Sequence, residues 1–331
     1  METRTLGRTG LKVSVLGFGC GAVGGLMVRG NPADQERAVA HAIELGINYF
    51  DTAAMYGDGQ SERNLGRVIK SLKPEILVGT KVRVPASEKS RIEAAVTSSL
   101  EASLQRLQLE RVDLFQLHNH ITREGRGGDL TPEIVLGEVV PAFERLREQG
   151  KTRFYGITAV GDTPALHEVA DARVFDTAQV AYNVLNPSAG SAVAAGYPAH
   201  NFGNLFAHTR AASIGVIAIR VLAAGALSGV ETRHPLGSPS VEPIGSGSAY
   251  RIDVERARRL EPLVREGHAD SLIELAVRFV ISHDAASTAL VGYSTLDHLE
   301  YAAVAVNKGP LPQETLDRIA ALHNSFVGEA R

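Results

Sequence analysis

The chain alternates short apolar runs with longer segments of helical periodicity. Eight short runs, rich in β-branched and aromatic residues, are expected to be strands: residues 13–18, 48–50, 76–80, 112–117, 153–157, 177–181, 216–219 and 288–291. Apolar side chains recur every three or four positions between them. This predicts one helix that begins near Pro32 and seven further helices, over residues 62–72, 89–107, 132–149, 163–172, 205–212, 271–282 and 296–306.

This alternation predicts an α/β protein, a single (β/α)8 barrel over residues 1–331. Parallel strands need crossover helices, and closing eight of them into a barrel leaves no exposed sheet edge. The stretch before the first strand is expected to be a β-hairpin that turns at residues 8–10 and covers the bottom of the barrel. Two polar segments, 186–204 and 229–251, are too long for ordinary connections, and we expect them to fold over the active face.

One glycine pattern offers a competing interpretation. Gly19, Gly21 and Gly24 follow an apolar run with the spacing of a dinucleotide-binding turn. That motif requires its third glycine to open a helix, whereas the helical pattern here begins only near Pro32. We therefore favour the barrel, in which these glycines end the first strand at the active face. Dinucleotide phosphates in contact with residues 21–24 would contradict it.

Composition narrows the class of partner. The chain has 331 residues, 44% of them apolar, and a formal net charge of −3 without long runs of like charge, so we expect neither nucleic acid nor membrane as a partner. Cys20 is the single cysteine, and no run approaches the ~20 apolar residues of a spanning helix. The first residues lack signal-peptide features, so we expect a cytoplasmic protein, monomeric or homo-oligomeric, that acts on a small molecule.

Four reactive side chains follow three consecutive predicted strands. Asp51 ends one strand and Tyr56 lies in the loop after it, Lys81 ends the next strand, and His118 ends the one after that. Each has a structural explanation when taken alone, such as a loop hydrogen bond, a packed ring, an ion pair or a core histidine. Because the carboxyl ends of barrel strands meet at one face, we expect the four to form a catalytic group.

The chemistry of this group favours proton transfer at an oxygen atom. A neutral phenol is a poor proton donor near pH 7, and the Lys81 ammonium would stabilise the phenolate of Tyr56. Asp51 would keep Lys81 charged and oriented, and His118 would polarise a carbonyl by a hydrogen bond. The chain has no GxSxG or HExxH motif and no clustered metal ligands, so hydrolysis and a bound metal are not expected. Hydride transfer to or from a carbonyl carbon is the reaction that fits a group able to add or remove a proton at the oxygen.

Over nearly its whole length the sequence resembles the aldo-keto reductases. The similar segments are "LGFGCGAVGG", "GINYFDTAAMYGDGQSE", "VGTKV", "DLFQLHNH", "EQGKTRFYGIT" and "AQVAYNVLN". The resemblance implies that Tyr56 is the general acid in reduction and the general base in oxidation. It also implies that Lys81 and Asp51 tune Tyr56, and that His118 positions the carbonyl. The next histidine, His120, is expected to be a loop residue that faces away from the site.

The resemblance further implies a nicotinamide cofactor, NADP(H) or NAD(H). Thr158 and Gln179 should bind its carboxamide, the segment 219–225 should flank the ring and pyrophosphate, and the segment 292–298 should hold the adenosine. The residues implied are Gly19, Cys20, Gly21, Asp51, Thr158, Gln179, Ile219, Arg220, Val221, Leu222, Gly225, Gly292, Tyr293, Ser294, Thr295 and His298.

Several positions depart from the family pattern. Thr158-Ala159 replaces a common Ser-Asn, and Ile219-Arg220 stands where the ring-stacking residue is often aromatic. Gly292 and His298 occupy places where many members have the Lys and Arg that clamp a 2′-phosphate. A dianionic phosphate gains most from charged partners, so we expect weak discrimination between the cofactors, with NAD or dual use favoured.

We therefore expect an oxidoreductase that interconverts a carbonyl and an alcohol. "GKTRFYGIT" and "ALVGYST" resemble the branch of aldose dehydrogenases, which implies an aldose or other polyhydroxy substrate. One alternative is a nucleotide-binding regulatory subunit with incidental reductase activity, similar to potassium-channel β subunits. Another is a lyase or isomerase that uses Lys81 as a Schiff-base amine.

Overall fold

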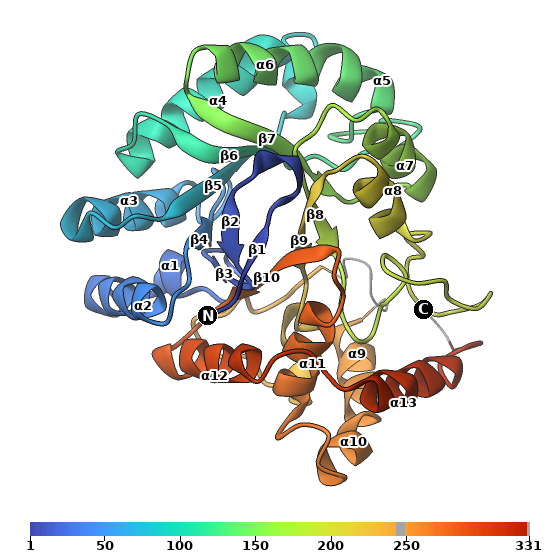
Figure 1. The fold of residues 1–331 in the computed structure, drawn as a ribbon. Coiled ribbons are helices and arrows are strands. Elements are labelled where there is room, and N and C mark those ends of the chain that lie inside the picture. The colour runs from blue at the N-terminus through green and yellow to red at the C-terminus, as the bar shows by residue number, and fades with distance from the viewer. Residues whose placement is uncertain (243–248, 330–331) are drawn as a thin grey trace.

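A closed parallel barrel stands at the centre of the protein (Figure 1). The computed structural model describes residues 1–242 and 249–329. Within them the barrel strands are β3 (Leu16–Gly19), β4 (Tyr49–Asp51), β5 (Leu77–Val82), β6 (Val112–Leu117), β7 (Thr152–Ala159), β8 (Thr177–Ala181), β9 (Gly215–Ile219) and β10 (Ala286–Gly292). They follow one another around the barrel, and β10 pairs with β3 to close it. The predicted (β/α)8 fold is confirmed, and the dinucleotide-turn interpretation of the glycines is wrong.

The first predicted strand is two strands in the structure. Residues 13–18 were expected to be continuous, but β2 (Lys12–Ser14) pairs antiparallel with β1 (Thr3–Thr5), and only β3 enters the barrel. The turn of this hairpin contains a 3-10 segment, η1 (Gly7–Thr9), and Gly10 with a φ of +69°. Leu6 and Val13 pack against Tyr49 inside the barrel. The expected plug at the bottom is therefore present (Figure 1).

Helices surround the barrel in the predicted segments (Figure 1). They are α2 (Pro32–Glu44), α3 (Gln60–Leu72), α4 (Ile92–Leu107), α7 (Thr163–Asp171), α8 (Leu205–Ala211), α11 (Leu272–Ile281) and α12 (Leu296–Asn307). The predicted helix over 132–149 is α5 (Pro132–Ile134), a π-helical turn η3 (Val135–Val139) and α6 (Val140–Glu148). The pattern did not indicate α1 (Leu26–Arg29), α9 (Tyr250–Arg258), α10 (Glu261–Arg265), α13 (Gln313–Asn324) or the 3-10 segments η2 (Ala86–Glu88) and η4 (Ala223–Ser228).

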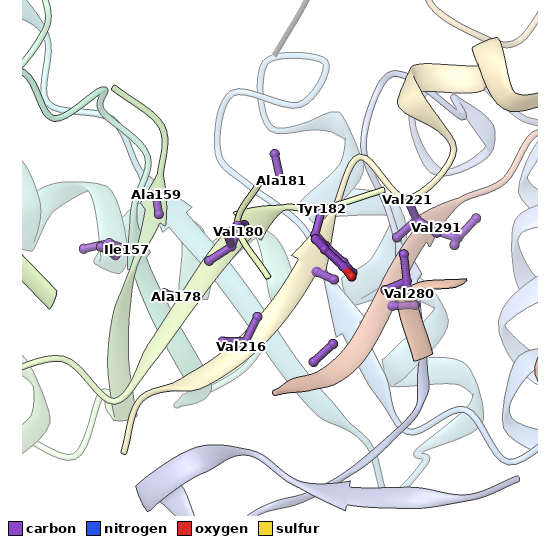
Figure 2. Close-up of a cluster of buried hydrophobic side chains, with 14 of the residues drawn as sticks. Ile157, Ala159, Ala178, Val180, Ala181, Tyr182, Val216, Val221, Val280 and Val291 are labelled. Carbon is purple, nitrogen blue, oxygen red and sulfur yellow. The ribbon is translucent and has the colours of Figure 1, made fainter. Parts of the chain in front are cut away.

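The barrel is fixed to its helices by a continuous buried core. Ile157 of β7, Val180 of β8 and Val216 of β9 lie in one cluster with Val280 of α11 (Figure 2). Each such side chain contributes about 1.5–3 kcal/mol by leaving water. Because successive strand residues point to opposite sides, a Val180 packed against the helices turns its neighbour Gln179 into the barrel.

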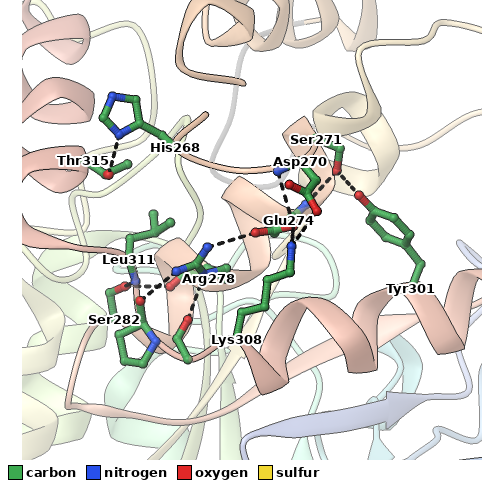
Figure 3. A network of polar contacts seen from close by, with 12 residues as sticks. His268, Asp270, Ser271, Glu274, Arg278, Ser282, Tyr301, Lys308, Leu311 and Thr315 are labelled. Atoms are coloured by element: carbon green, nitrogen blue, oxygen red, sulfur yellow. Dashed lines mark hydrogen bonds and ion pairs between the residues drawn. The ribbon is translucent and has the colours of Figure 1, made fainter. Parts of the chain in front are cut away.

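A polar network fastens the last helices to one another (Figure 3). Glu274 and Arg278 of α11 form an ion pair at 2.9 Å, and Lys308 after α12 contacts Glu274 at 2.6 Å. His268 bonds Thr315 of α13 at 2.9 Å. This network is structural and lies on the outside of the barrel. Among the described residues no helix has the length and apolar character needed to cross a membrane.

The two long polar segments differ in their contacts. Within 229–242, Ser238 donates to the carbonyl of Ala22 at 2.9 Å, so this part lies against the loop after β3, as expected for the active face. The segment 186–204 is tied to α7, where His167 bonds the carbonyl of Phe202 at 2.9 Å, and to the chain end, where the Gly328 amide donates to Gly196. Residues 243–248 of the expected loop lie outside the described residues.

Candidate active site

The four candidate residues meet at the carboxyl ends of β4, β5 and β6. Asp51 is the last residue of β4, Lys81 precedes the last residue of β5, and His118 follows β6 directly. Lys81 Nζ forms an ion pair with Asp51 and lies 3.3 Å from the Tyr56 hydroxyl. The rings of Tyr56 and His118 are perpendicular, with centroids 5.9 Å apart. The structure thus brings together all four side chains that the sequence singled out.

The loop that carries Tyr56 is folded tightly onto the barrel. Gly57 and Gly59 have φ values of 61° and 76°, the left-handed region that glycine adopts without strain. Ser61, in the first turn of α3, donates to the carbonyl of Cys20 at 2.8 Å. These contacts fix the height of Tyr56 above the barrel mouth, where its side chain stays partly exposed.

Lys81 is a buried cation held by three oxygen atoms, those of the Asp51 carboxylate, the Tyr56 hydroxyl and a backbone carbonyl. Its side chain has no exposed surface, and Nζ also donates to the carbonyl of Thr52 at 2.9 Å. Burial by itself opposes the charge, but the neighbouring Asp51 and Tyr56 outweigh burial, so the pKa of Lys81 is raised above its ordinary value. Lys81 therefore remains an ammonium at neutral pH.

Asp51 is the centre of a buried hydrogen-bond network. Its Oδ1 faces Lys81, while Oδ2 accepts from the Tyr49 hydroxyl at 2.8 Å, from Gln179 Nε2 at 2.7 Å and from Gln116 Nε2 at 3.3 Å. Such donors stabilise a buried carboxylate. Sequence reasoning missed Tyr49 and Gln116. The available signal was their position two residues before Asp51 and His118, which places them on the same side of their strands.

His118 is neutral over the physiological range. Burial, together with the positive charges of Lys81, Arg83 and His120, lowers its pKa to about 3. A neutral imidazole carries one N–H donor, which suits it to hydrogen-bond a carbonyl oxygen. His120 lies in the loop after β6, as expected, where its Nδ1 is 3.8 Å from Asp129, and its charge also acts on His118.

Thr158 and Gln179 stand opposite each other on β7 and β8. Thr158 Oγ1 is buried and has no hydrogen-bond partner among the described residues. A buried hydroxyl without a partner is costly, and a bound ligand is one explanation for such a group. The side-chain amide nitrogen of Gln179 donates a hydrogen bond to Asp51. The pair therefore offers free hydrogen-bonding groups at the place where the sequence predicts a carboxamide.

The segment after β9 follows an irregular path. Arg220 has a φ of +58°, and its carbonyl accepts from Asn183 at 2.9 Å. Its guanidinium is largely enclosed, and burial lowers its pKa below the ordinary value. It makes no ion pair with any carboxylate of residues 1–242 and 249–329. Ile219, Val221, Leu222 and Gly225 surround this turn at the same barrel face.

In the segment after β10, the side chains mainly make contacts with other residues of the protein. Tyr293 is buried against Phe18, with ring centroids 5.0 Å apart. The Ser294 hydroxyl donates to Gly24 at 2.6 Å, and Thr295 caps α12. His298, in the first turn of α12, lies near His234, with ring centroids 5.9 Å apart. Gly292 ends β10.

Close packing explains two glycines at the end of β3 and in the loop after it, Gly19 and Gly24. A Cβ added to Gly24 would lie 2.4 Å from the backbone nitrogen of Tyr293, which leaves no room for a side chain. A Cβ on Gly19 would lie 3.0 Å from the Val291 carbonyl oxygen, and one on Gly21 would lie 3.5 Å from the Tyr56 ring. Cys20 between them is fully buried, and burial raises the pKa of its thiol. Gly24 and Gly19 thus allow the close approach of β3 and its loop to β10 and Tyr293, whereas the separation at Gly21 is an ordinary contact distance.

Comparison with known proteins agrees with this geometry. The model of the Aldo/keto reductase family matches residues 15–324. An L-galactose dehydrogenase of Arabidopsis thaliana is 30% identical over 97% of this chain and 94% of its own length. An aldo-keto reductase from Bacillus halodurans, in its holo form, superposes with a TM-score of 0.72 at 26% identity and covers 97% of this chain and 96% of its own.

A more distant structure shares the fold. It is an aldo/keto reductase from Klebsiella pneumoniae in complex with NADP and acetate, with a TM-score of 0.68 at 23% identity over 100% of this chain and 97% of its own. The match of the family model over almost the whole chain, on a closed barrel with Asp51, Tyr56, Lys81 and His118 at one mouth, decides the family. This protein belongs to the aldo/keto reductase family.

Proposed function

We propose that this protein is an NAD(P)-dependent oxidoreductase that interconverts a carbonyl and an alcohol, with Tyr56 as the proton donor and acceptor. The observation that carries the proposal is the buried Lys81 ammonium, which lies between the Asp51 carboxylate and the Tyr56 hydroxyl, 3.3 Å from the latter. A cation at this distance stabilises the phenolate that remains when Tyr56 releases its proton.

The residues divide the work at the reacting oxygen. In reduction, neutral His118 donates a hydrogen bond to the carbonyl oxygen, and Tyr56 then transfers its proton to that oxygen as charge develops there. Lys81 stabilises the resulting phenolate, and Asp51 keeps Lys81 in place. In oxidation the same groups act in reverse, with the Tyr56 phenolate accepting the alcohol proton.

The residues around β7, β8 and β9 fit a nicotinamide nucleotide. The unpartnered Thr158 hydroxyl and Gln179 would hold the carboxamide, and the Arg220 guanidinium, which lacks an ion pair among the described residues, would face the phosphates. When bound, this cofactor supplies or accepts a hydride at the carbonyl carbon. Positions 292 and 298 are glycine and histidine rather than the lysine and arginine that would bind a 2′-phosphate. This supports use of NAD, or of both cofactors.

For the substrate we propose an aldose or related polyhydroxy compound. The relative that is 30% identical over most of both chains is named an L-galactose dehydrogenase, which supports a sugar-like substrate. The complete network around Asp51 supports retained chemistry rather than a purely regulatory role.

The proposal is tested by comparing the catalytic activity of the wild-type protein with that of the Tyr56→Phe variant. Purified protein is assayed with NADH and NADPH on aldehydes, ketones and sugars, and in reverse on the alcohols. We expect Tyr56→Phe to lower kcat/KM by at least about 100-fold, because general acid catalysis contributes that much or more. Tyr301→Phe, on the outer face of α12 and 39% exposed, is the matched control and should keep full activity. Unchanged turnover in Tyr56→Phe, or cofactor binding without turnover of any compound, would contradict the proposal.

A further inference from the structure

A second cationic residue, Arg83, follows the end of the strand that carries Lys81. Arg83 lies two residues beyond Lys81, and residues two apart on an extended chain point to the same side. The backbone beyond the end of β5 is fixed by the buried side-chain amide of Asn119, whose Oδ1 accepts from the Val84 amide and whose Nδ2 donates to the Val84 carbonyl, both at 2.8 Å. Arg83 directly follows the carboxyl end of β5, and its charge acts on His118, so we place it at the barrel mouth near His118.

The Arg83 guanidinium is available to a ligand. Arg83 is exposed, and it makes no hydrogen bond or ion pair with any described residue. Its Nη2 lies 3.9 Å from the position of a Cβ built on Gly128, so the side chain lies against the loop 119–131. Its positive charge, with those of Lys81 and His120, also acts on His118.

The acidic groups of the neighbouring loop are already engaged. Asp129 lies 3.8 Å from His120 Nδ1, and Glu124 is paired with Arg126 at 2.6 Å. Asp162 accepts from the Arg123 amide at 2.8 Å. Arg83 is thus an uncompensated cation on a protein whose net charge is −3.

The position of Arg83 separates it from the predicted cofactor groups. In the closed order of eight strands, β5 stands directly across the barrel from β9, which Arg220 follows, while the segment predicted to hold the adenosine follows β10. An anion bound by Arg83 therefore belongs to the substrate rather than to the cofactor phosphates.

We propose that Arg83 binds a carboxylate of the substrate, so that the preferred substrates are carbonyl compounds with an acidic group at the far end, such as a hexuronate. This inference rests on the proposed function and narrows its substrate class. Two residues of strand advance about 7 Å, so the carboxylate lies several bonds from the carbonyl that faces Tyr56 and His118. A guanidinium binds a carboxylate in a two-pronged geometry that a neutral amide group does not reproduce.

The test compares D-glucuronate with D-glucuronamide, which differ in the charge at the far end. We expect the wild-type protein to favour glucuronate in kcat/KM by about 10- to 100-fold, the value of a hydrogen bond to a charged group. Arg83→Gln should abolish most of this preference while leaving turnover of a neutral aldehyde, D-glyceraldehyde, within about twofold. Arg83→Lys should retain part of the preference, and added salt should weaken it because the site is exposed.

Arg126→Gln is the matched control, because it removes the same charge from an arginine whose side chain is 83% exposed and paired with Glu124. Calorimetric titration in the Tyr56→Phe background with NADH bound, where turnover is suppressed, measures the same preference as a ratio of Kd values. A wild-type ratio near one, binding of neither compound, or a ratio that survives Arg83→Gln overturns the inference. If D-glyceraldehyde and every other carbonyl fail to react, the proposed function fails instead.

Discussion

The neutral state of His118 leads to a quantitative prediction about acid stability. The ordinary pKa of histidine is 6.5, and in the folded protein the pKa of His118 is about 3. Each unit of difference corresponds to about 1.4 kcal/mol, so this one side chain is expected to contribute up to about 5 kcal/mol of stability at neutral pH. Acidification should remove this contribution.

The direction follows from which state binds the proton first. Between pH 6.5 and 3 the unfolded chain protonates this histidine while the folded chain keeps it neutral. Stability from His118 is therefore fully present above pH 6.5 and is lost as the pH falls toward 3, at about 1.4 kcal/mol per unit. Burial also lowers the pKa values of His283 and His323, so the wild-type slope contains their contributions as well.

A comparison of wild type with His118→Gln isolates the effect. Urea unfolding is measured for both proteins at pH 5, 6 and 7, and glutamine serves as a side chain that does not titrate. The difference in free energy of unfolding between the two should be about 2 kcal/mol smaller at pH 5 than at pH 7. A difference that does not change with pH would refute the linkage.

An NMR titration measures the same group directly. The ring resonance that disappears in His118→Gln identifies His118 among the 11 histidines. It should keep its neutral chemical shift down to about pH 4. A titration midpoint near the ordinary value would show that the imidazole is not enclosed as described, and would remove the argument for a neutral hydrogen-bond donor.

Three further predictions follow from the contacts around the mouth. Tyr49→Phe removes the hydroxyl that Asp51 accepts at 2.8 Å and should lower the free energy of unfolding in urea by about 1.5–3 kcal/mol; no change would exclude Tyr49 from the network. Asn119→Ala should destabilise by about 2–3 kcal/mol in thermal unfolding, because three hydrogen bonds are lost, and wild-type stability would contradict that role. His298→Arg should strengthen NADPH binding about tenfold relative to NADH, as seen by reduced-nicotinamide fluorescence; an unchanged ratio would place the 2′-phosphate elsewhere.

The architecture could be predicted because each strand and helix pair carries its own local pattern. Alternating apolar runs and helical periodicity are read within windows of ten to twenty residues, and closure of eight strands follows from their number. The error at residues 13–18 has a local cause, since the hairpin strand and the first barrel strand form one apolar run divided by Val15. Helices of four or five residues, such as α1 and α10, are too short to show a period.

Only those site residues were predicted that combine a reactive side chain with a position at or after the end of a predicted strand. Asp51, Tyr56, Lys81 and His118 combine reactive chemistry with strand ends, and the structure brings them together. Tyr49 and Gln116 occupy interior positions that are usually apolar, and although their spacing places them on the site's side of their strands, it does not show that both contact the same carboxylate. That contact depends on the packing of three strands around the barrel axis.

Gln179 connects this interior network with the predicted cofactor contact. Its side-chain oxygen cannot face a carboxylate favourably, so the bond to Asp51 at 2.7 Å fixes the nitrogen toward Asp51 and turns the oxygen elsewhere. A nicotinamide carboxamide offers N–H donors, and an oxygen held in this orientation accepts one of them. Asp51 thereby holds two partners at once, the Lys81 ammonium, which also donates to the Tyr56 hydroxyl, and the amide nitrogen of Gln179. The same carboxylate thus fixes both the proton-transfer group and the side chain predicted to hold the cofactor.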